Sequence, residues 1–210
     1  MKSSVWCLGE QRPSGNHGVM STQLTGRLLV ATPVLTDPNF ARAVVLVLDH
    51  DEDGTLGVVV NRPTGVDVTA VLPPWSDLTS TPQVVFQGGP VALDSALGLA
   101  AVTAGHGDAE ADEEPLGWRR VHERIGLVDL DAPPEILAAE LSAMRIFAGY
   151  AGWGPGQVED EIAEGAWYVV DSEPADAFSE NPSDLWPRVL RRQTGDLAFV
   201  ATFPDDPSMN

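Results

Sequence analysis

A glycine-rich segment, Gly149–Gly156, contains residues of the types that can bind an anion through backbone N–H groups. Alternate glycines within it lie between a predicted strand and a predicted helix, and a helix N-terminus attracts negative charge. The spacing is not that of a dinucleotide fingerprint, Pro155 removes one donor, and no phosphate-loop lysine follows. The segment therefore fits either an anion cradle or a sharp turn whose Tyr150 and Trp153 pack on the sheet.

Further features of the same kind occur elsewhere in the chain. Gln87–Pro90 combines two glycines that allow close backbone approach with a proline that fixes the exit. Asn61–Pro63 ends a predicted strand with an amide and a guanidinium, and Arg145 opens an apolar strand, where we expect a carboxylate partner at the sheet edge. The predicted ligand-binding residues are Asn61, Arg62, Gly88, Gly89, Arg145, Tyr150, Trp153, Gly154 and Gln157.

Metal-binding patterns are incomplete. Asp49–Gly54 resembles the first half of a calcium loop, but position twelve is Val60 where a bidentate glutamate is needed, and the flanks read as strands. An exposed acidic hairpin turn is favoured instead. The four histidines, which we expect on the surface, lack the spacing of a helical metal site; they are His17, His50, His106 and His122. The sequence thus predicts no metal and no cofactor.

The sequence also lacks a recognisable set of catalytic residues. The sequence contains no Gly-x-Ser-x-Gly elbow, and Ser95 lacks the glycines that such a strained turn requires. Cys7 lies ahead of any periodic segment. Glu159 and Glu161 are the best placed acids, but a spacing of two on a helix directs them apart, and acids near a helix N-terminus stabilise it. We therefore predict no catalytic residues.

Composition and charge narrow the function classes. A chain of 210 residues with 43% hydrophobic residues can bury one sizeable core. The net charge of -19 opposes direct binding to a phosphate backbone, which depends on Lys and Arg. The basic residues available for a local patch, which we expect to form ion pairs with the abundant carboxylates, are Arg119, Arg120, Arg124, Arg188, Arg191 and Arg192.

Apolar runs bounded by turn residues predict the strands. Leu28–Ala31 and Ala43–Leu48 read as buried strands, and Leu56–Val60 follows the acidic turn to complete an antiparallel hairpin. Further strands are predicted at Val84–Phe86, with Leu97–Val102 as its neighbour, at Arg145–Phe147 and at Trp167–Val170. Because neighbouring strands form hairpins and the helices come later, the pattern favours an α+β domain over a parallel array.

Helices are predicted in the second half of the chain. Pro133 and Pro134 precede a predicted helix over Glu135–Met144 that packs through Ile136, Leu137 and Leu141. Shorter helices are predicted at Gln157–Glu164, Ala175–Phe178 and Asp184–Arg192, and Ala198–Thr202 closes the fold. We expect a single domain over residues 21–210.

Two segments fall outside the predicted core. Residues 1–20 are rich in small and polar residues without an apolar signal region, so we expect a disordered N-terminal arm and a cytoplasmic protein with no membrane span. Residues 105–116 contain a run of acids that predicts a mobile surface loop.

The ordered motifs resemble those of the YqgE/AlgH family. The similarity begins at Gly26–Pro33 and continues through Gly57–Pro63, Gln87–Val91 and Arg145–Trp153 to Ala201–Asn210. It spans about residues 24–210, and the N-terminal arm and acidic loop depart from it. The resemblance implies a mixed, mostly antiparallel α+β fold with a barrel-like sheet flanked by short helices. It implies no established enzyme activity; some members carry the label of transcriptional regulator, linked to alginate control in pseudomonads.

Three functions are compatible with these observations. The first is a non-enzymatic binding or regulatory protein that acts through contacts with a protein partner. The second is a protein that binds a small molecule or nucleotide through an anionic group, with or without hydrolysis. The third is direct DNA binding, which the acidic charge makes the least favoured of the three.

Overall fold

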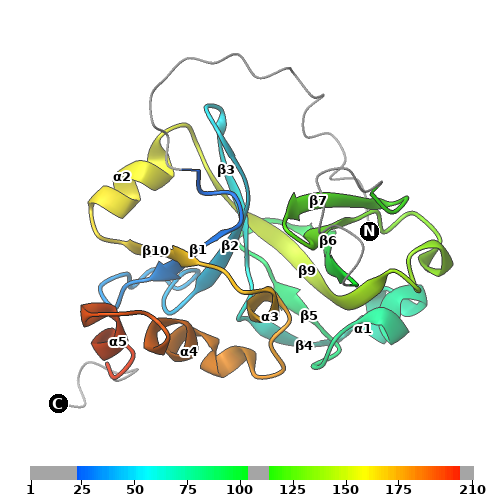
Figure 1. The fold of residues 1–210 in the computed structure, drawn as a ribbon. Coiled ribbons are helices and arrows are strands. Elements are labelled where there is room, and N and C mark those ends of the chain that lie inside the picture. The colour runs from blue at the N-terminus through cyan, green and yellow to red at the C-terminus, as the bar shows by residue number, and fades with distance from the viewer. Residues whose placement is uncertain (1–22, 104–113, 204–210) are drawn as a thin grey trace.

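The structure is a computed structural model that describes residues 23–103 and 114–203 (Figure 1). Its strands are β1 (Arg27–Ala31), β2 (Val44–Asp51), β3 (Gly54–Val59), β4 (Pro63–Asp67), β5 (Val84–Gln87), β6 (Val91–Val102), β7 (Trp118–His122), β8 (Ile125–Val128), β9 (Leu141–Trp153) and β10 (Trp167–Asp171). Its helices are α1 (Val68–Val71), α2 (Gln157–Ala163), α3 (Pro174–Ala177), α4 (Leu185–Arg191) and α5 (Asp196–Val200), with 3-10 turns at Pro73–Leu78, Pro134–Ile136 and Pro182–Asp184.

The strands form one curled sheet in the order β10-β1-β2-β3-β9-β6-β8-β7, with β5 beside β9 and β4 beside β5. Neighbours are antiparallel except for β5 and β9, which are parallel. The long strand β9 joins the two halves, because it pairs with β6 over most of its length and with β3 near Trp153. The predicted class, a single α+β domain with a mostly antiparallel barrel-like sheet and short helices, is confirmed.

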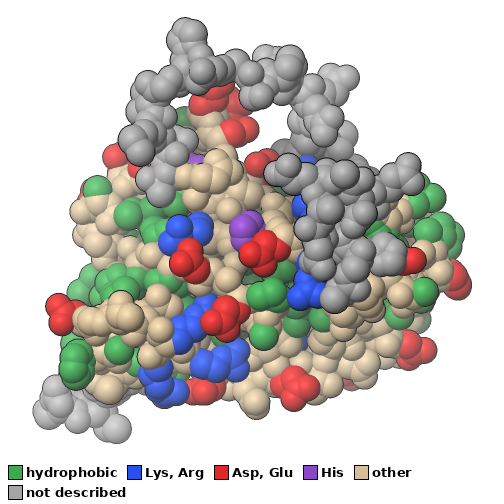
Figure 2. Space-filling model, in the orientation of Figure 1, with side chains coloured by type: hydrophobic (Ala, Val, Ile, Leu, Met, Phe, Trp, Pro, Cys, Tyr) green, Lys and Arg blue, Asp and Glu red, His purple; other side chains and the backbone are tan. Residues whose placement is uncertain are grey.

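Short helices lie along one side of the sheet at the C-terminal end of the chain. In Figure 1, α4 and α5 lie side by side below β1 and β10. Figure 2 shows basic side chains gathered over α4 on the face toward the viewer, and hydrophobic side chains around α5. The last third of the chain therefore supplies both a wall of the core and a distinct outer surface.

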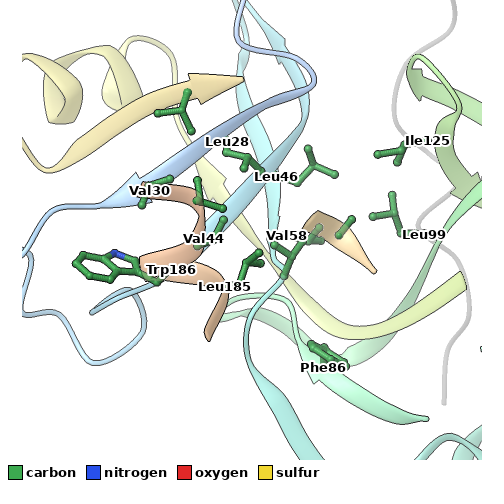
Figure 3. Close-up of a cluster of buried hydrophobic side chains, with 14 of the residues drawn as sticks. Leu28, Val30, Val44, Leu46, Val58, Phe86, Leu99, Ile125, Leu185 and Trp186 are labelled. Carbon is green, nitrogen blue, oxygen red and sulfur yellow. The ribbon is translucent and has the colours of Figure 1, made fainter. Parts of the chain in front are cut away.

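Alternation along the strands divides the core. Leu28 and Leu46 lie in a cluster inside the curl, whereas their neighbours Leu29 and Val45 lie in a second cluster on the opposite face. Both faces are covered, so these strands read as continuous apolar runs. Figure 3 shows the inner cluster, to which α4 contributes Leu185 and Trp186. A third cluster forms around Trp75 and Met144 in the other half of the sheet.

The predicted helix over Glu135–Met144 is wrong. The chain makes only a 3-10 turn at Pro134–Ile136 and enters β9 at Leu141. Ile136 is 43% exposed, so it does not pack as predicted, although Leu137 is buried. The alanines of this segment favour a helix locally, but pairing of Ala143 and Met144 with β6 overrides that preference.

Two further predictions about strands need correction. Leu97–Val102 belongs to β6, which is not the neighbour of Val84–Phe86, because β9 lies between β6 and β5. Gly149–Gly156 is not a turn throughout, since β9 continues to Trp153. The hairpin around the acidic turn is confirmed, as are the first and last predicted strands and the helix after Gly156.

The predicted N-terminal arm over residues 1–20 lies outside the described residues. Most of the predicted acidic loop does too, and only its last residues, 114–116, are described. In the described part of the chain, no helix is both long and apolar enough to cross a bilayer.

Candidate functional site

The glycines Gly88 and Gly89 lie where the chain after β5 crosses β9. The N–H of Gly88 donates to the carbonyl of Ala148 at 2.9 Å, and its carbonyl accepts from Val59 at 2.8 Å. A Cβ on Gly88 would lie 2.3 Å from the carbonyl oxygen of Gly149, closer than any real contact. Close packing of two backbones therefore requires glycine here, and the amide of Gly88 is already used within the chain.

Asn61 and Arg62 hold the loop before β2. The amide of Asn61 accepts from the N–H of Val44 at 2.9 Å and donates to the carbonyl of Arg42 at 2.9 Å. The guanidinium of Arg62 donates to the carbonyls of Pro38 at 2.8 Å and Ala41 at 2.9 Å. Both side chains thus act as bridges between the end of β3 and this loop.

The environment of Arg62 is partly desolvated. Burial lowers the pKa of Arg62, an effect that the nearby carboxylate of Asp37 opposes. Since the pKa of an arginine starts far above neutrality, the guanidinium stays charged and keeps its donors.

Arg145 is buried in the interior and is only 1% exposed. It donates to the carbonyls of Ala177 at 3.1 Å, Ser179 at 3.1 Å and Thr81 at 2.9 Å. Its guanidinium carbon lies 4.2 Å from the ring centroid of Phe86. The predicted pairing with a carboxylate at the sheet edge is wrong, because β9 is a central strand and backbone carbonyls at the end of α3 and before β5 surround the charge.

One hydrogen-bond donor of the Arg145 guanidinium is not used in the described part of the chain. Its Nε has no hydrogen-bond partner within the described residues, and burial lowers the pKa of Arg145 to about 10. The cation is therefore held by carbonyl dipoles and an aromatic face, without an ionic partner in the described part of the chain.

Trp153, Gly154 and Gln157 form a bonded cluster at the start of α2. Oε2 of Glu161 accepts from the indole N–H of Trp153 at 3.0 Å and from that of Trp167 at 2.8 Å. The amide of Gln157 donates to the other carboxylate oxygen at 3.0 Å and accepts from the N–H of Gly154 at 3.0 Å. The glycine turn is therefore closed by side chains of α2.

The aromatic rings of this cluster fill the space between them. The ring centroids of Phe40, Trp153 and Trp167 lie 5.5 to 6.0 Å apart in stacked and edge-on arrangements. Both tryptophans are buried, at 6% and 3% exposure. The sequence did not indicate that Glu161 joins two tryptophans, although its position one helical turn after Gln157 was visible.

His50 is buried, so the expectation that every histidine lies on the surface is wrong. Its side chain is 4% exposed, its Nδ1 lies 2.8 Å from Oγ1 of Thr55, and its Nε2 lies 3.4 Å from Oε1 of Glu159. Alternation along β2 places Asp49 outward and His50 inward, and this signal was available in the sequence. Thr55 is itself buried, so the arrangement offers no exposed nucleophile.

The predicted ligand-binding residues spread along β9 and do not surround one point. Gly88 and Gly89 lie against Gly149 and Tyr150, and the carbonyl of Arg62 accepts from Gln87 beside them. Arg145 lies under α3, and the cluster of Trp153, Gly154 and Gln157 lies at the far end of β9. Arg145 and Trp153 are eight residues apart along β9, which at a rise of about 3.3 Å per residue is roughly 26 Å.

Metal ligands do not gather within the residues that the structure describes, where no group of three His, Cys, Asp or Glu side chains could hold an ion. The acids of the Asp49–Gly54 turn are exposed at the tip of the β2–β3 hairpin, as the preferred interpretation of this segment predicted.

Comparison with known proteins assigns the chain to a family. The family model described as AlgH-like matches residues 28–198. The chain belongs to the AlgH-like family. The resemblance to the YqgE/AlgH family inferred from the motifs is thus confirmed. Among AlgH-like relatives, a UPF0301 protein of Streptomyces coelicolor is 69% identical over 189 residues, which cover 90% of this chain and 96% of the relative. A UPF0301 protein of Thermobifida fusca is 50% identical and covers 89% and 96%.

Two solved structures are similar to this chain in fold. The crystal structure of a protein from Corynebacterium diphtheriae has a TM-score of 0.79 and 33% identity, covering 93% of this chain and 95% of that one. The solution structure of the AlgH protein from Pseudomonas aeruginosa has a TM-score of 0.61 and 25% identity, covering 90% and 98%.

Proposed function

We propose that this AlgH-like chain is a non-enzymatic cytoplasmic protein that binds or regulates through contacts with a protein partner. The observation that supports this most is that the polar side chains of the motifs form hydrogen bonds within the chain itself. Asn61, Arg62, Gln157 and Glu161 direct their polar atoms at this chain's own backbone or side chains. Their chemistry holds the fold together, which leaves the outer surface to contact other molecules.

The charge distribution supports a protein partner over DNA. The chain has a net charge of -19, and several of its arginines are paired with acids. Arg192 binds both carboxylate oxygens of Asp176 at 2.7 and 2.6 Å, and Nε of Arg120 lies 3.7 Å from Glu114. Paired arginines release few counterions on binding a phosphate backbone, so direct DNA binding is not part of the proposal.

Affinity capture tests this function. The full chain, immobilised through its N-terminus, is exposed to lysate of the source cell at low and at moderate salt, beside an immobilised unrelated protein of equal negative charge. We expect a stoichiometric protein partner that the charge-matched protein does not retain. Recovery of no specific partner at either salt concentration would reject the proposal.

The lone donor of Arg145 favours a second candidate, a binder of a small anionic molecule or nucleotide, with or without hydrolysis. A buried guanidinium whose Nε has no partner in the described residues is a group that an anion can satisfy. Thermal unfolding with a panel of inorganic phosphate and nucleotides tests it, since a ligand at 100 times its Kd stabilises by about 2.7 kcal/mol. Absence of any shift, or a shift that Arg145→Lys, which removes this Nε, leaves unchanged, counts against this candidate.

A further inference from the structure

Two phenylalanines are exposed on and just after the C-terminal helix α5. Phe199 is 69% exposed and Phe203 is 54% exposed, whereas Leu197 and Val200 of the same segment pack against the inner core. The backbone keeps its turn beyond α5, because the N–H of Phe203 donates to the carbonyl of Val200 at 3.0 Å. Arg42 fixes this end by donating to the carbonyl of Phe203 at 3.1 Å. Exposed aromatic side chains so placed are typical of protein contact sites.

The outer side of the neighbouring helix α4 is basic. Arg188 and Arg191 lie in its last turn, and its apolar side is buried in the core. Arg191 has only a long, exposed pair with Asp184 at 3.9 Å, and within the residues described Arg188 has no carboxylate partner. Besides Asp184, which precedes α4, the acid on these two helices is Asp196 in the first turn of α5.

We infer that the α4–α5 face, made of Arg42, Arg188, Arg191, Phe199 and Phe203, binds an acidic peptide segment that carries an aromatic or aliphatic side chain. This inference rests on the proposed protein-binding function and names its surface. Such a segment needs basic and hydrophobic side chains close together, and Figure 2 shows basic side chains over α4 and hydrophobic ones around α5. Arginine and aromatic residues supply most of the affinity at interfaces, so the pair is a suitable anchor.

Charge complementarity selects the occupant. The chain carries 31 acidic and 12 basic residues, so an acidic segment is repelled by most of its surface and is accepted where arginines predominate. At physiological salt the screening length is about 8 Å, so the local charge of the face outweighs the net charge of the whole molecule. A basic segment would instead be directed to other parts of the surface.

Selection from a displayed library of random twelve-residue peptides tests this inference on the full chain. We expect enriched peptides to be acidic, to contain an aromatic or aliphatic residue, and to bind more weakly as salt is raised. The double variant R188E/R191E and the single variant Phe199→Ser are each expected to weaken binding roughly tenfold or more. The controls are Arg119→Glu, a single charge reversal, and Leu116→Ser, an apolar-to-polar exchange, at exposed positions on and before β7. They should leave binding unchanged.

Other outcomes overturn the inference. Enrichment of basic peptides, or acidic peptides that bind R188E/R191E as tightly as the wild type, would show that this face is not the site. Unchanged melting temperatures of the variants establish that they remain folded. Capture from lysate separates the two levels: a partner retained equally by wild type and R188E/R191E refutes the face but keeps protein binding, and no partner for either refutes the proposed function.

Discussion

Replacement of Glu161 by alanine should destabilise the protein strongly, because one carboxylate joins three elements. Its Oε2 accepts from two indole N–H groups, of Trp153 in β9 and Trp167 in β10, and both rings are largely buried. Each N–H left unpaired in such a site costs about 1–3 kcal/mol. The expected loss in Glu161→Ala is therefore roughly 4 kcal/mol, a large share of a typical stability of about 5–15 kcal/mol.

Urea unfolding followed by circular dichroism measures this loss. Glu164→Ala is the matched control, since Glu164 is exposed at the end of the same helix and a surface substitution stays within about 0.5 kcal/mol. Glu161→Gln keeps an acceptor oxygen for the indoles but loses the charge, so its loss should be smaller, about 1–2 kcal/mol. If Glu161→Ala and Glu164→Ala unfold within 1 kcal/mol of each other, the carboxylate does not hold the two tryptophans and the reasoning fails.

Two other substitutions test the packing and the ion pairs. Gly88→Ala would place a methyl group 2.3 Å from a backbone carbonyl of β9 and should cost about 3 kcal/mol in urea unfolding; Gly65→Ala, which meets open space, should cost less than about 1 kcal/mol. Arg192→Ala leaves the carboxylate of Asp176, whose side chain is 3% exposed, without its cationic partner and should cost about 3–5 kcal/mol. Arg191→Ala, which removes an exposed pair at 3.9 Å, should change thermal stability by less than about 1 kcal/mol. Equal losses in the two arginine variants would contradict this ranking.

Most of the secondary structure could be predicted from local sequence patterns. The β2–β3 hairpin was predictable because two apolar runs flank a short acidic turn, and α2 because acids follow a glycine turn. The segment over Glu135–Met144 was not, because its alanines favour a helix and only pairing with a distant strand makes it extended. The pairing of β5 with β9 could not be predicted either, because β9 lies more than fifty residues after β5 in the sequence.

The sequence singled out polar side chains of the candidate site but not the groups to which they bond. Asn61, Arg62 and Gln157 were singled out by type and position, and the structure shows that each bonds to a nearby loop or helix. That an arginine on an apolar strand would be enclosed by backbone carbonyls depends on α3, whose docking the sequence of β9 does not encode. The burial of His50 could have been inferred from the alternation along β2.

The inner core begins with Leu28 and is completed mainly by α4, through Leu185, Trp186, Val189 and Leu190, with Ala201 after it. During synthesis, β1 and β2 are made long before α4, which packs over their apolar face. Until α4 emerges, β1 and β2 expose one apolar face, which is a binding site for chaperones and for other nascent chains. About 130 residues separate the end of β2 at Asp51 from the start of α4 at Leu185. At about 5–20 residues per second, the apolar face therefore stays uncovered for roughly 7–27 s, the period in which the chain is most prone to aggregate.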